Sequence, residues 1–480
     1  MAAGDIEHVI VLMLENRSFD SMLGALYPAG PGFAGLTGTE SNPYQRSDGI
    51  EALPVWSSAA MDPIAATTPR PDPGERFVDM NEQLFGPGQP RSASRPSMKG
   101  FIANYMKQPA TSDPKDPMAV MHYFTPDQIP VLSTLAKAFG VCDQWFASAP
   151  CQTWPNRFFT HTGTSGGHVD NAQFPIAFPA PSIFRQLSNA GKSWRVYFHD
   201  VPQSIMLQDV WPWGLGNFHL FSQFLADAGS AASADPGATG LPNYSFIEPR
   251  YFPDLGLGIP NDQHPPHNVA AGEKLIADVY NAVRNSGIWK KSLLVITYDE
   301  HGGCYDHFSP PQGVSPDGLG PPGFSFDTYG VRVPAVIISP FMPPGSVVRS
   351  APAGISYAAP PYPFDHTSII ATLRALFGLA HPLTNRDRAA PHLLDALSLL
   401  SPTNDGPSQI DYPDPDVDQD TVRASAGQAP NGHQTALSGM VQQLPTAPAM
   451  QAIARPPILF ATALQAGLDA AARIKTLLAL

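Results

Sequence analysis

The sequence predicts an α/β fold with a central, mostly parallel β-sheet, and two observations support this prediction. Short, continuous apolar runs recur along the chain between turn residues, which is typical of strands buried on both faces of a sheet. Longer segments with apolar residues at helical spacing lie between these runs. Strands that alternate with helices are joined by crossover connections, so the sheet they build is mostly parallel.

Four segments are predicted to be strands. Residues 8–14 (HVIVLML), 292–298 (SLLVITY) and 333–339 (VPAVIIS) are continuous apolar runs, as expected of buried central strands. Residues 193–198 (SWRVYF) alternate more between apolar and polar side chains.

Three segments between the strands are predicted to be helices. Residues 130–139 (PVLSTLAKAF) begin with proline, which is favoured in the first turn of a helix. Residues 271–286 are followed by Gly287, and residues 366–377 by Gly378. Both glycines are candidate C-caps.

The remaining segments predict long loop insertions and a C-terminal extension. The chain contains 54 prolines and 40 glycines among 480 residues, and residues 25–100 and 310–330 are especially rich in turn-forming residues. We expect one main domain over residues 1–400 and a polar linker or arm over 401–455. Residues 456–480 are expected to form an amphipathic helix that packs on the body or on a partner, with one apolar face made of Phe460, Leu464, Leu468 and Ala471.

Composition excludes several classes of protein. The net charge is -13 and no run of Lys or Arg is present, which argues against nucleic-acid binding. No stretch of about 18 uncharged apolar residues predicts a membrane-spanning helix. The N-terminus has no basic region typical of a signal peptide, so we expect a cytoplasmic protein, or one secreted by a leader absent from this sequence. The three cysteines allow at most one disulfide and favour a reducing compartment.

Polar residues follow two of the predicted buried strands. Glu15 and Asn16 end the first run, and Asp299 and Glu300 end the run at 292–298. Ligands of open parallel sheets gather at the carboxyl ends of the strands, so these oxygen ligands predict a site for a divalent metal ion. The structural alternatives are a helix cap at Asn16 or Ser18 and a solvated turn at Asp299.

Thr153 precedes Pro155, which is predicted to begin a helix. A helix N-terminus offers unpaired N–H groups and partial positive charge, both suited to phosphate. A hydroxyl there is a candidate nucleophile if a metal or a base activates it. For Thr153 taken in isolation, an ordinary helix cap is the favoured interpretation.

Histidines are numerous, and several lie near the predicted strand ends. His199 follows the strand candidate at 193–198, His264 precedes the helix at 271–286, and His122 lies in MHYF. Imidazole can donate to phosphoryl oxygens or protonate a leaving group. A single histidine is more often a hydrogen-bonded structural residue than a catalyst.

Taken together and in order, these motifs resemble the bacterial phospholipase C and acid phosphatase superfamily, a branch related to alkaline phosphatase, and also the plant non-specific phospholipases C. ENRSFD and YDEHGGxxDH together are the most specific signature. The resemblance covers about residues 5–380, and its segments are IEHVIVLMLENRSFDSMLG (6–24), LAKAFGVCDQWFAS (135–148), TWPNR (153–157), WRVYFHD (194–200), DQHPPHNVAAGE (262–273), VITYDEHGGCYDHFSPP (295–311), YGVRVPAVIISPF (329–341) and FDHTSII (364–370).

The resemblance implies an alkaline-phosphatase-like three-layer sandwich and a phosphoesterase catalytic domain over residues 1–400. It also implies Thr153 as the nucleophile and His264, His199 and His122 as residues that contact the phosphoryl group, with His264 in the best-preserved context. The implied cofactor is one or more divalent metal ions, held by Glu15, Asn16, Thr153, Asp299 and Glu300.

The expected reaction is hydrolysis of phosphodiesters, with phospholipid head-group esters as substrates, a covalent phosphothreonine intermediate and transient contact with a membrane surface. The alternatives are a broad-specificity acid phosphatase acting on phosphomonoesters, and a non-catalytic binding protein that retains the fold. The oligomeric state is left open by the sequence.

Overall fold

A computed structural model describes residues 5–91, 95–109, 115–230, 240–256, 258–351, 356–412, 415, 418–445 and 458–479. At its centre is an eight-stranded sheet in which only β10 runs antiparallel to its neighbours. The strands are, in spatial order, β11 (Ser346–Val347), β4 (Gly140–Val141), β10 (Ala335–Ile338), β9 (Ser292–Tyr298), β1 (His8–Leu14), β8 (Tyr244–Glu248), β6 (Trp194–Phe198) and β7 (Phe218–Leu220).

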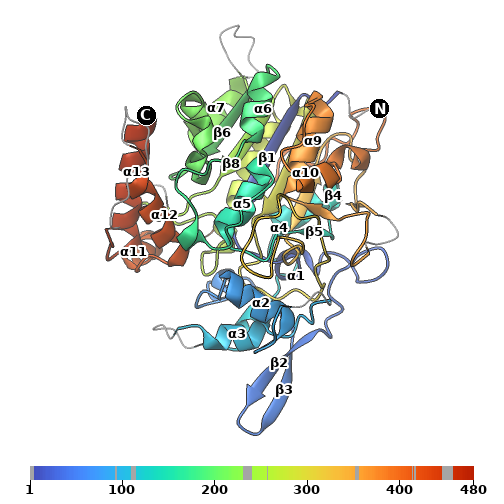
Figure 1. The fold of residues 1–480 in the computed structure, drawn as a ribbon, viewed down its shortest axis with the longest axis vertical. Helices are drawn as coiled ribbons and strands as arrows, with labels where there is room; N and C mark the ends of the chain where they lie inside the picture. Colours follow the sequence, from blue (N-terminus) through green and yellow to red (C-terminus); the bar gives the residue numbers. More distant parts are fainter. Residues whose placement is uncertain are drawn as a thin grey trace.

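Helices cover both faces of this sheet, as Figure 1 shows. On one face α8 contacts α4, α7 and strands β1 and β9, and on the other α5 contacts α6 and α9. These helices are α4 (Pro130–Ala138), α5 (Thr153–Thr162), α6 (Ile183–Asn189), α7 (Phe221–Ser230), α8 (Val269–Arg284) and α9 (Thr367–Phe377). The predicted α/β sandwich with a mostly parallel sheet is therefore confirmed.

The two central strands lie where the apolar runs predict them. β1 and β9 pair in parallel over seven residues, from His8 opposite Ser292 to Leu14 opposite Tyr298. Nearly every residue of both strands is buried, because helices cover both faces. This register places the residues that follow the two strands side by side.

The predicted helix ends are partly correct. α9 ends at Gly378, whose φ of 65° is the left-handed conformation that glycine adopts at low cost. α8 instead ends at Arg284, with Asn285 as its C-cap, so the expected cap at Gly287 is wrong.

Two segments predicted to be irregular contain regular structure. Within residues 25–100 lie the hairpin β2 (Ser41–Arg46) and β3 (Gly49–Pro54), which projects from the body in Figure 1, and α2 (Phe77–Phe85). The segment expected to be a linker or an arm, 401–455, contains α11 (Gln419–Gly427) and α12 (Gly432–Gln443), and its residues 446–455 lie outside the described residues. The remaining α-helices and β-strands are α1 (Phe19–Leu23), α3 (Phe101–Lys107), β5 (Trp145–Phe146), β12 (Phe364–Asp365), α10 (Asn385–Ala389) and α13 (Ala463–Leu478).

The C-terminal helix α13 packs beside α11 and α12, but not through the predicted face. Leu468 is 57% exposed, Leu464 and Ala471 are half-buried, and Phe460 precedes the helix. The buried face consists of Ala463, Ala466, Gly467, Ala470 and Ile474. These small residues allow the close approach of the backbone to the body, since a Cβ at Gly467 would lie 2.6 Å from Phe252 Cβ.

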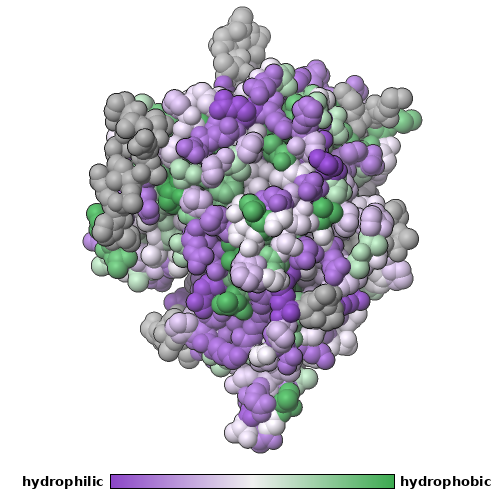
Figure 2. Space-filling view, in the orientation of Figure 1, coloured by the Kyte–Doolittle hydropathy of each residue, from purple (hydrophilic) through white to green (hydrophobic). Residues whose placement is uncertain are grey.

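The outer surface is mixed. On the face drawn in Figure 2, polar residues predominate and apolar side chains are scattered among them. None of the described helices is both long enough and apolar enough to cross a membrane. All three cysteines are buried and free, so the one disulfide that the sequence allowed does not form.

A buried carboxyl group joins α8 to the N-terminus of α4 and predicts a pH-dependent stability. Glu273 accepts hydrogen bonds from the backbone N–H groups of Val131 (2.6 Å) and Leu132 (3.2 Å). Burial nevertheless raises the pKa of Glu273 from its usual 4.5 to about 8. The folded protein therefore holds a proton that the unfolded chain releases above pH 4.5, and the stability that this proton contributes is lost as the pH rises towards 8.

Glu273→Gln is expected to remove this dependence, because glutamine keeps the acceptor oxygen and cannot ionise. Between pH 5.5 and 7.5 the wild type is expected to lose up to about 1.4 kcal/mol of unfolding free energy per pH unit through this group. Urea midpoints at both pH values, compared with those of Glu51→Gln in the exposed hairpin, measure the difference. Equal pH slopes for the wild type and Glu273→Gln would contradict the assignment.

Candidate active site

Four polar residues meet at the carboxyl edge of the sheet, as the sequence predicts. Glu15 and Asn16 follow β1, Asp299 and Glu300 follow β9, and all four are buried. Asp299 Oδ1 accepts hydrogen bonds from the backbone N–H groups of Asn16 (2.9 Å) and Glu300 (2.7 Å). Asn16 has a φ of 55°, a left-handed conformation that asparagine tolerates better than most residues. The Ser18 side chain caps α1, so the cap alternative holds for Ser18 while Asn16 remains available to the site.

Thr153 lies opposite these residues. It is the first residue of α5, with Gln152 as the N-cap, and its side chain is fully buried. Its Oγ1 lies 3.4 Å from Glu15 Oε2 and 3.5 Å from Asn16 Oδ1. These distances are long for hydrogen bonds between oxygens, so the hydroxyl faces the carboxylate and amide oxygens without being tightly held by them.

Arg157 completes this part of the site and was not assigned a role from the sequence. It lies one helical turn after Thr153, and its Nε and Nη2 donate to Glu15 Oε1 at 3.0 and 2.7 Å. Gln203 donates to the same oxygen at 2.9 Å, so Oε1 is occupied while Oε2 faces Thr153. The signal in the sequence was the arginine of the TWPNR motif, whose spacing of four residues places it on the same side of α5 as Thr153.

The carboxylates of this site have the properties expected of metal ligands. Burial raises the pKa of Glu15, Asp299 and Glu300, partly against the opposing charge of Arg157 in the first two. Asp299 Oδ2 is buried and has no hydrogen-bond partner among the described residues. Three buried carboxyl groups beside a single arginine are costly unless another cation is present. A divalent ion with oxygen ligands therefore fits the residues found here.

His264 lies next to this cluster in a second acidic group. Its Nδ1 donates to the Pro265 carbonyl (2.6 Å), and its Nε2 lies 3.2 Å from Glu75 Oε1. Asp72 lies 3.8 Å from Nδ1. Although burial lowers the pKa of His264, the carboxylates of Glu75 and Asp72 outweigh it and raise the pKa well above its usual value. The two carboxylates thus favour the protonated form of His264.

Glu75 and Asp72 are functional candidates that the sequence did not reveal. Both lie just before α2, within the segment interpreted as loops, and nothing in their local pattern points to a site. Glu75 Oε1 also accepts from Asn16 Nδ2 at 2.7 Å, so it connects His264 with the metal-ligand cluster. With His264, these two residues lie close enough together to hold a metal ion.

A second histidine comes from α12, beyond the expected catalytic domain. His433 is buried, its ring stacks on that of His264 at 5.6 Å, and its Nε2 lies 3.7 Å from Glu15 Oε1. Burial, together with the charges of His264 and Arg157, lowers its pKa well below the usual value. The pKa values of the two stacked rings are therefore shifted in opposite directions. The polar composition of residues 401–455 gave no sign of this role.

The other two predicted histidines have different surroundings among the described residues. His122 lies 3.2 Å from Ser58 Oγ and packs on Trp56 and Phe124, and burial lowers its pKa to about 4. His199 stacks on Phe221, and its Nδ1 donates to the carbonyl of Glu248 at 3.2 Å. The structure thus brings Thr153 and His264 to the same centre, but it does not bring His122 or His199 into contact with them.

A further acidic group is an ion-pair network. Asp20, Asp306 and His307 lie close enough together to bind a metal ion. However, Arg332 already donates to Asp20 at 2.8 Å and to Asp306 at 3.0 Å. The arginine supplies positive charge to these carboxylates, so we interpret this group as a structural ion-pair network and not as a metal site.

Comparisons with known proteins identify the family of this chain. A sequence model of the Phosphoesterase family matches residues 6–380. Non-specific phospholipase C1 of Arabidopsis thaliana is 40% identical over 395 residues, which cover 80% of this chain and 69% of that relative. Phospholipase C A of Mycobacterium tuberculosis is 28% identical over 471 residues, covering 85% and 80% of the two chains. A solved alkaline phosphatase superfamily protein from Vibrio parahaemolyticus is 11% identical, with a TM-score of 0.34 over 55% of this chain and 63% of that chain. The family match and the phospholipase C relatives confirm the resemblance predicted from the motifs.

Proposed function

Since this chain belongs to the phosphoesterase family and is a hydrolase of phosphoric esters, we propose that it is a metal-assisted phospholipase C that hydrolyses phosphodiesters of phospholipids. The observation that supports this most is the placement of the Thr153 hydroxyl against Glu15 and Asn16, beside Asp299 and Glu300. The relatives that carry the name phospholipase C support the class of substrate.

The residues suggest a two-step displacement. Thr153 Oγ1 attacks phosphorus, its proton passes to Glu15 Oε2, and the bond from phosphorus to the alcohol oxygen breaks. His264, held as an imidazolium by Glu75, gives its proton to the departing alcohol. Water then attacks the phosphothreonine: His264 takes up its proton, Glu15 returns a proton to Thr153, and the phosphorylated head group leaves.

The metal-ligand residues would be Glu15, Asn16, Thr153, Asp299 and Glu300. A divalent cation bound there would lower the pKa of the Thr153 hydroxyl and neutralise charge that develops on the phosphoryl oxygens. Arg157 fixes the orientation of Glu15 by holding Oε1, which leaves Oε2 directed at Thr153.

The proposed function is tested by comparing two chromogenic esters. Purified protein is expected to hydrolyse p-nitrophenylphosphorylcholine faster than p-nitrophenyl phosphate, and a chelator is expected to abolish both activities until a divalent metal is restored. Preference for p-nitrophenyl phosphate would instead support the acid phosphatase alternative. Hydrolysis of neither would support a binding protein, and activity that survives exhaustive chelation would exclude the metal.

The role of His264 predicts a dependence on the leaving group. His264→Gln is expected to lower kcat for phosphatidylcholine by about 10²- to 10⁴-fold, because a glycerol alkoxide is a poor leaving group without a proton. The effect on p-nitrophenylphosphorylcholine is expected to be much smaller, since p-nitrophenolate leaves readily. His122→Gln and His199→Gln, measured in the same way, test the two other predicted histidines. Equal losses of His264→Gln activity on both esters would contradict the role of general acid.

A further inference from the structure

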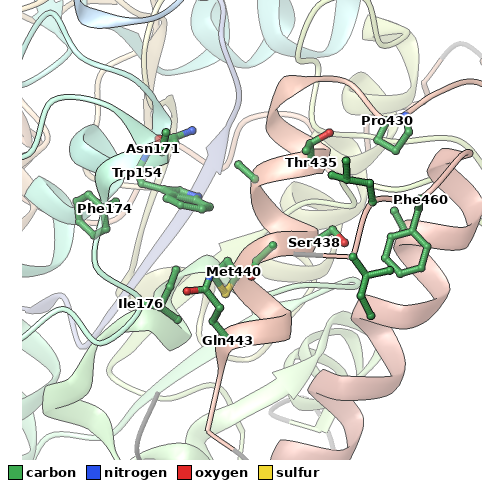
Figure 3. A pocket seen from close by; sticks show the side chains of 16 residues that line it. Trp154, Asn171, Phe174, Ile176, Pro430, Thr435, Ser438, Met440, Gln443 and Phe460 are labelled. Carbon is green, nitrogen blue, oxygen red and sulfur yellow. Dashed lines mark hydrogen bonds between the residues drawn. The ribbon is translucent and has the colours of Figure 1, made fainter. Parts of the chain in front are cut away.

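An apolar pocket lies immediately beside the candidate active site. It has a volume of about 290 Å³ and is lined by Trp154 and Phe174 on one side of α12, by residues of α12 itself, and by Phe460 on the other side of that helix (Figure 3). None of the residues that line it is charged. Its size is near the lower end of ordinary ligand pockets, which are roughly 300–1,000 Å³. Most of the lining residues are apolar or aromatic, which suits a hydrocarbon chain, and the lining offers no positive charge for a phosphate.

Both walls are connected directly to catalytic residues. Trp154 follows the candidate nucleophile Thr153 in α5. On the opposite wall, α12 begins beside His433, which stacks on His264, and continues through Ala436 and Met440 to Gln443 along the pocket. The ten residue-to-residue steps from His433 to Gln443 span about 15 Å of helix. The pocket therefore extends outward from the histidine pair along a single helix.

We propose that this pocket binds an acyl chain of the phospholipid substrate, so that α12 and residues 458–460 form the lipid-selective part of the active site. This inference rests on the proposed function. In the proposed reaction His264 protonates the glycerol oxygen, which places the glycerol and its acyl chains on the side of the stacked histidines. His433 of that pair belongs to α12, the helix that contributes Ala436 and Met440 to the pocket.

A polar atom in the wall supports this occupant. Trp154 is buried, and its indole Nε1 has no hydrogen-bond partner among the described residues. An unpaired buried N–H is costly, and an acyl ester offers a carbonyl oxygen that can accept from it at the polar end of the chain. A free hydrocarbon would leave this donor unpaired.

The test is to fill the pocket and measure selectivity. Ala436→Trp and Ala172→Trp place a large side chain on opposite walls of the pocket. Ala472→Trp is the matched control, because Ala472 is exposed on α13 and does not line the pocket. For each protein, kcat/KM is measured for dibutanoyl and dihexanoyl phosphatidylcholine and for p-nitrophenylphosphorylcholine.

The wild type and the control are expected to prefer the longer chain, since each buried methylene contributes about 0.8 kcal/mol, or about fourfold. Both pocket variants are expected to lose this preference, and their ratio of dihexanoyl to p-nitrophenyl activity is expected to fall by about tenfold or more. An unchanged ratio in both pocket variants, or an equal fall in Ala472→Trp, would overturn the inference while leaving the phospholipase proposal intact. A wild type that hydrolyses none of the three esters would overturn the proposed function itself and the inference with it.

Discussion

Replacing Thr153 with alanine is expected to reduce kcat for p-nitrophenylphosphorylcholine by about 10³- to 10⁶-fold, the range seen when a catalytic nucleophile is removed. The reason is that no other hydroxyl among the described residues takes the place of Oγ1 between Glu15 Oε2 and Asn16 Oδ1. Thr153→Ser keeps the hydroxyl and is expected to retain most of the activity. Rapid acid quenching of the wild type during turnover, followed by mass spectrometry, is expected to find phosphorylcholine on the peptide that contains Thr153.

A second threonine of the same helix provides the control. Thr162 is also buried in α5, and its hydroxyl donates to the Phe158 and Thr164 carbonyls, at the opposite end of the helix from the site. Thr162→Ala is expected to lower stability slightly and to leave kcat nearly unchanged. Near-normal turnover by Thr153→Ala would show that the phosphorus is attacked directly by water.

Among the proposed substitutions, replacing Arg332 with methionine is expected to lower the free energy of unfolding the most, by about 3–5 kcal/mol. Arg332 is fully buried and donates to Asp20, to Asp306 and to the carbonyls of Ala34 and Asp143. Its removal would leave Asp306 without its main counter-charge and Asp20 with only His307 beside it. The shift of the urea midpoint at pH 7 measures the effect.

An exposed arginine and a compensating change make this prediction specific. Arg423 pairs with Asp420 on the surface of α11, and its side chain is 64% exposed. Arg423→Met is therefore expected to shift stability by less than about 0.5 kcal/mol. Adding Asp20→Asn and Asp306→Asn to Arg332→Met is expected to recover part of the loss, because it removes the unpaired charges. A midpoint that does not move in Arg332→Met would show that the carboxylates are compensated in another way.

The strands and helices of the central sandwich could be predicted because buried elements produce local patterns of apolar residues in the sequence. The runs at 8–14 and 292–298 coincide with β1 and β9, since strands covered on both faces are continuously apolar. The face of α13 was predicted wrongly for a physical reason. Large apolar residues were expected to be buried, whereas close helix packing selected small residues such as Ala466 and Gly467.

Site residues that directly follow a strand could be predicted from the sequence. Site residues that are brought in by the folding of distant segments could not. Glu15, Asn16, Asp299 and Glu300 meet because their strands are neighbours in the sheet. Glu75 and His433 reach the same centre from a proline-rich segment and from the C-terminal region, and nothing in their local sequences specifies how those segments fold back.

The pairing of β1 with β9 has a consequence for changes in chain length. The two strands pair residue for residue up to Leu14 and Tyr298, immediately before Glu15 and Asp299. Inserting or deleting one residue in either strand would shift its end by about 3.3 Å and turn its side chains to the opposite face of the sheet. Homologous proteins that keep the activity are therefore expected to align through these two segments without gaps, and to vary in length at sites such as the projecting β2–β3 hairpin.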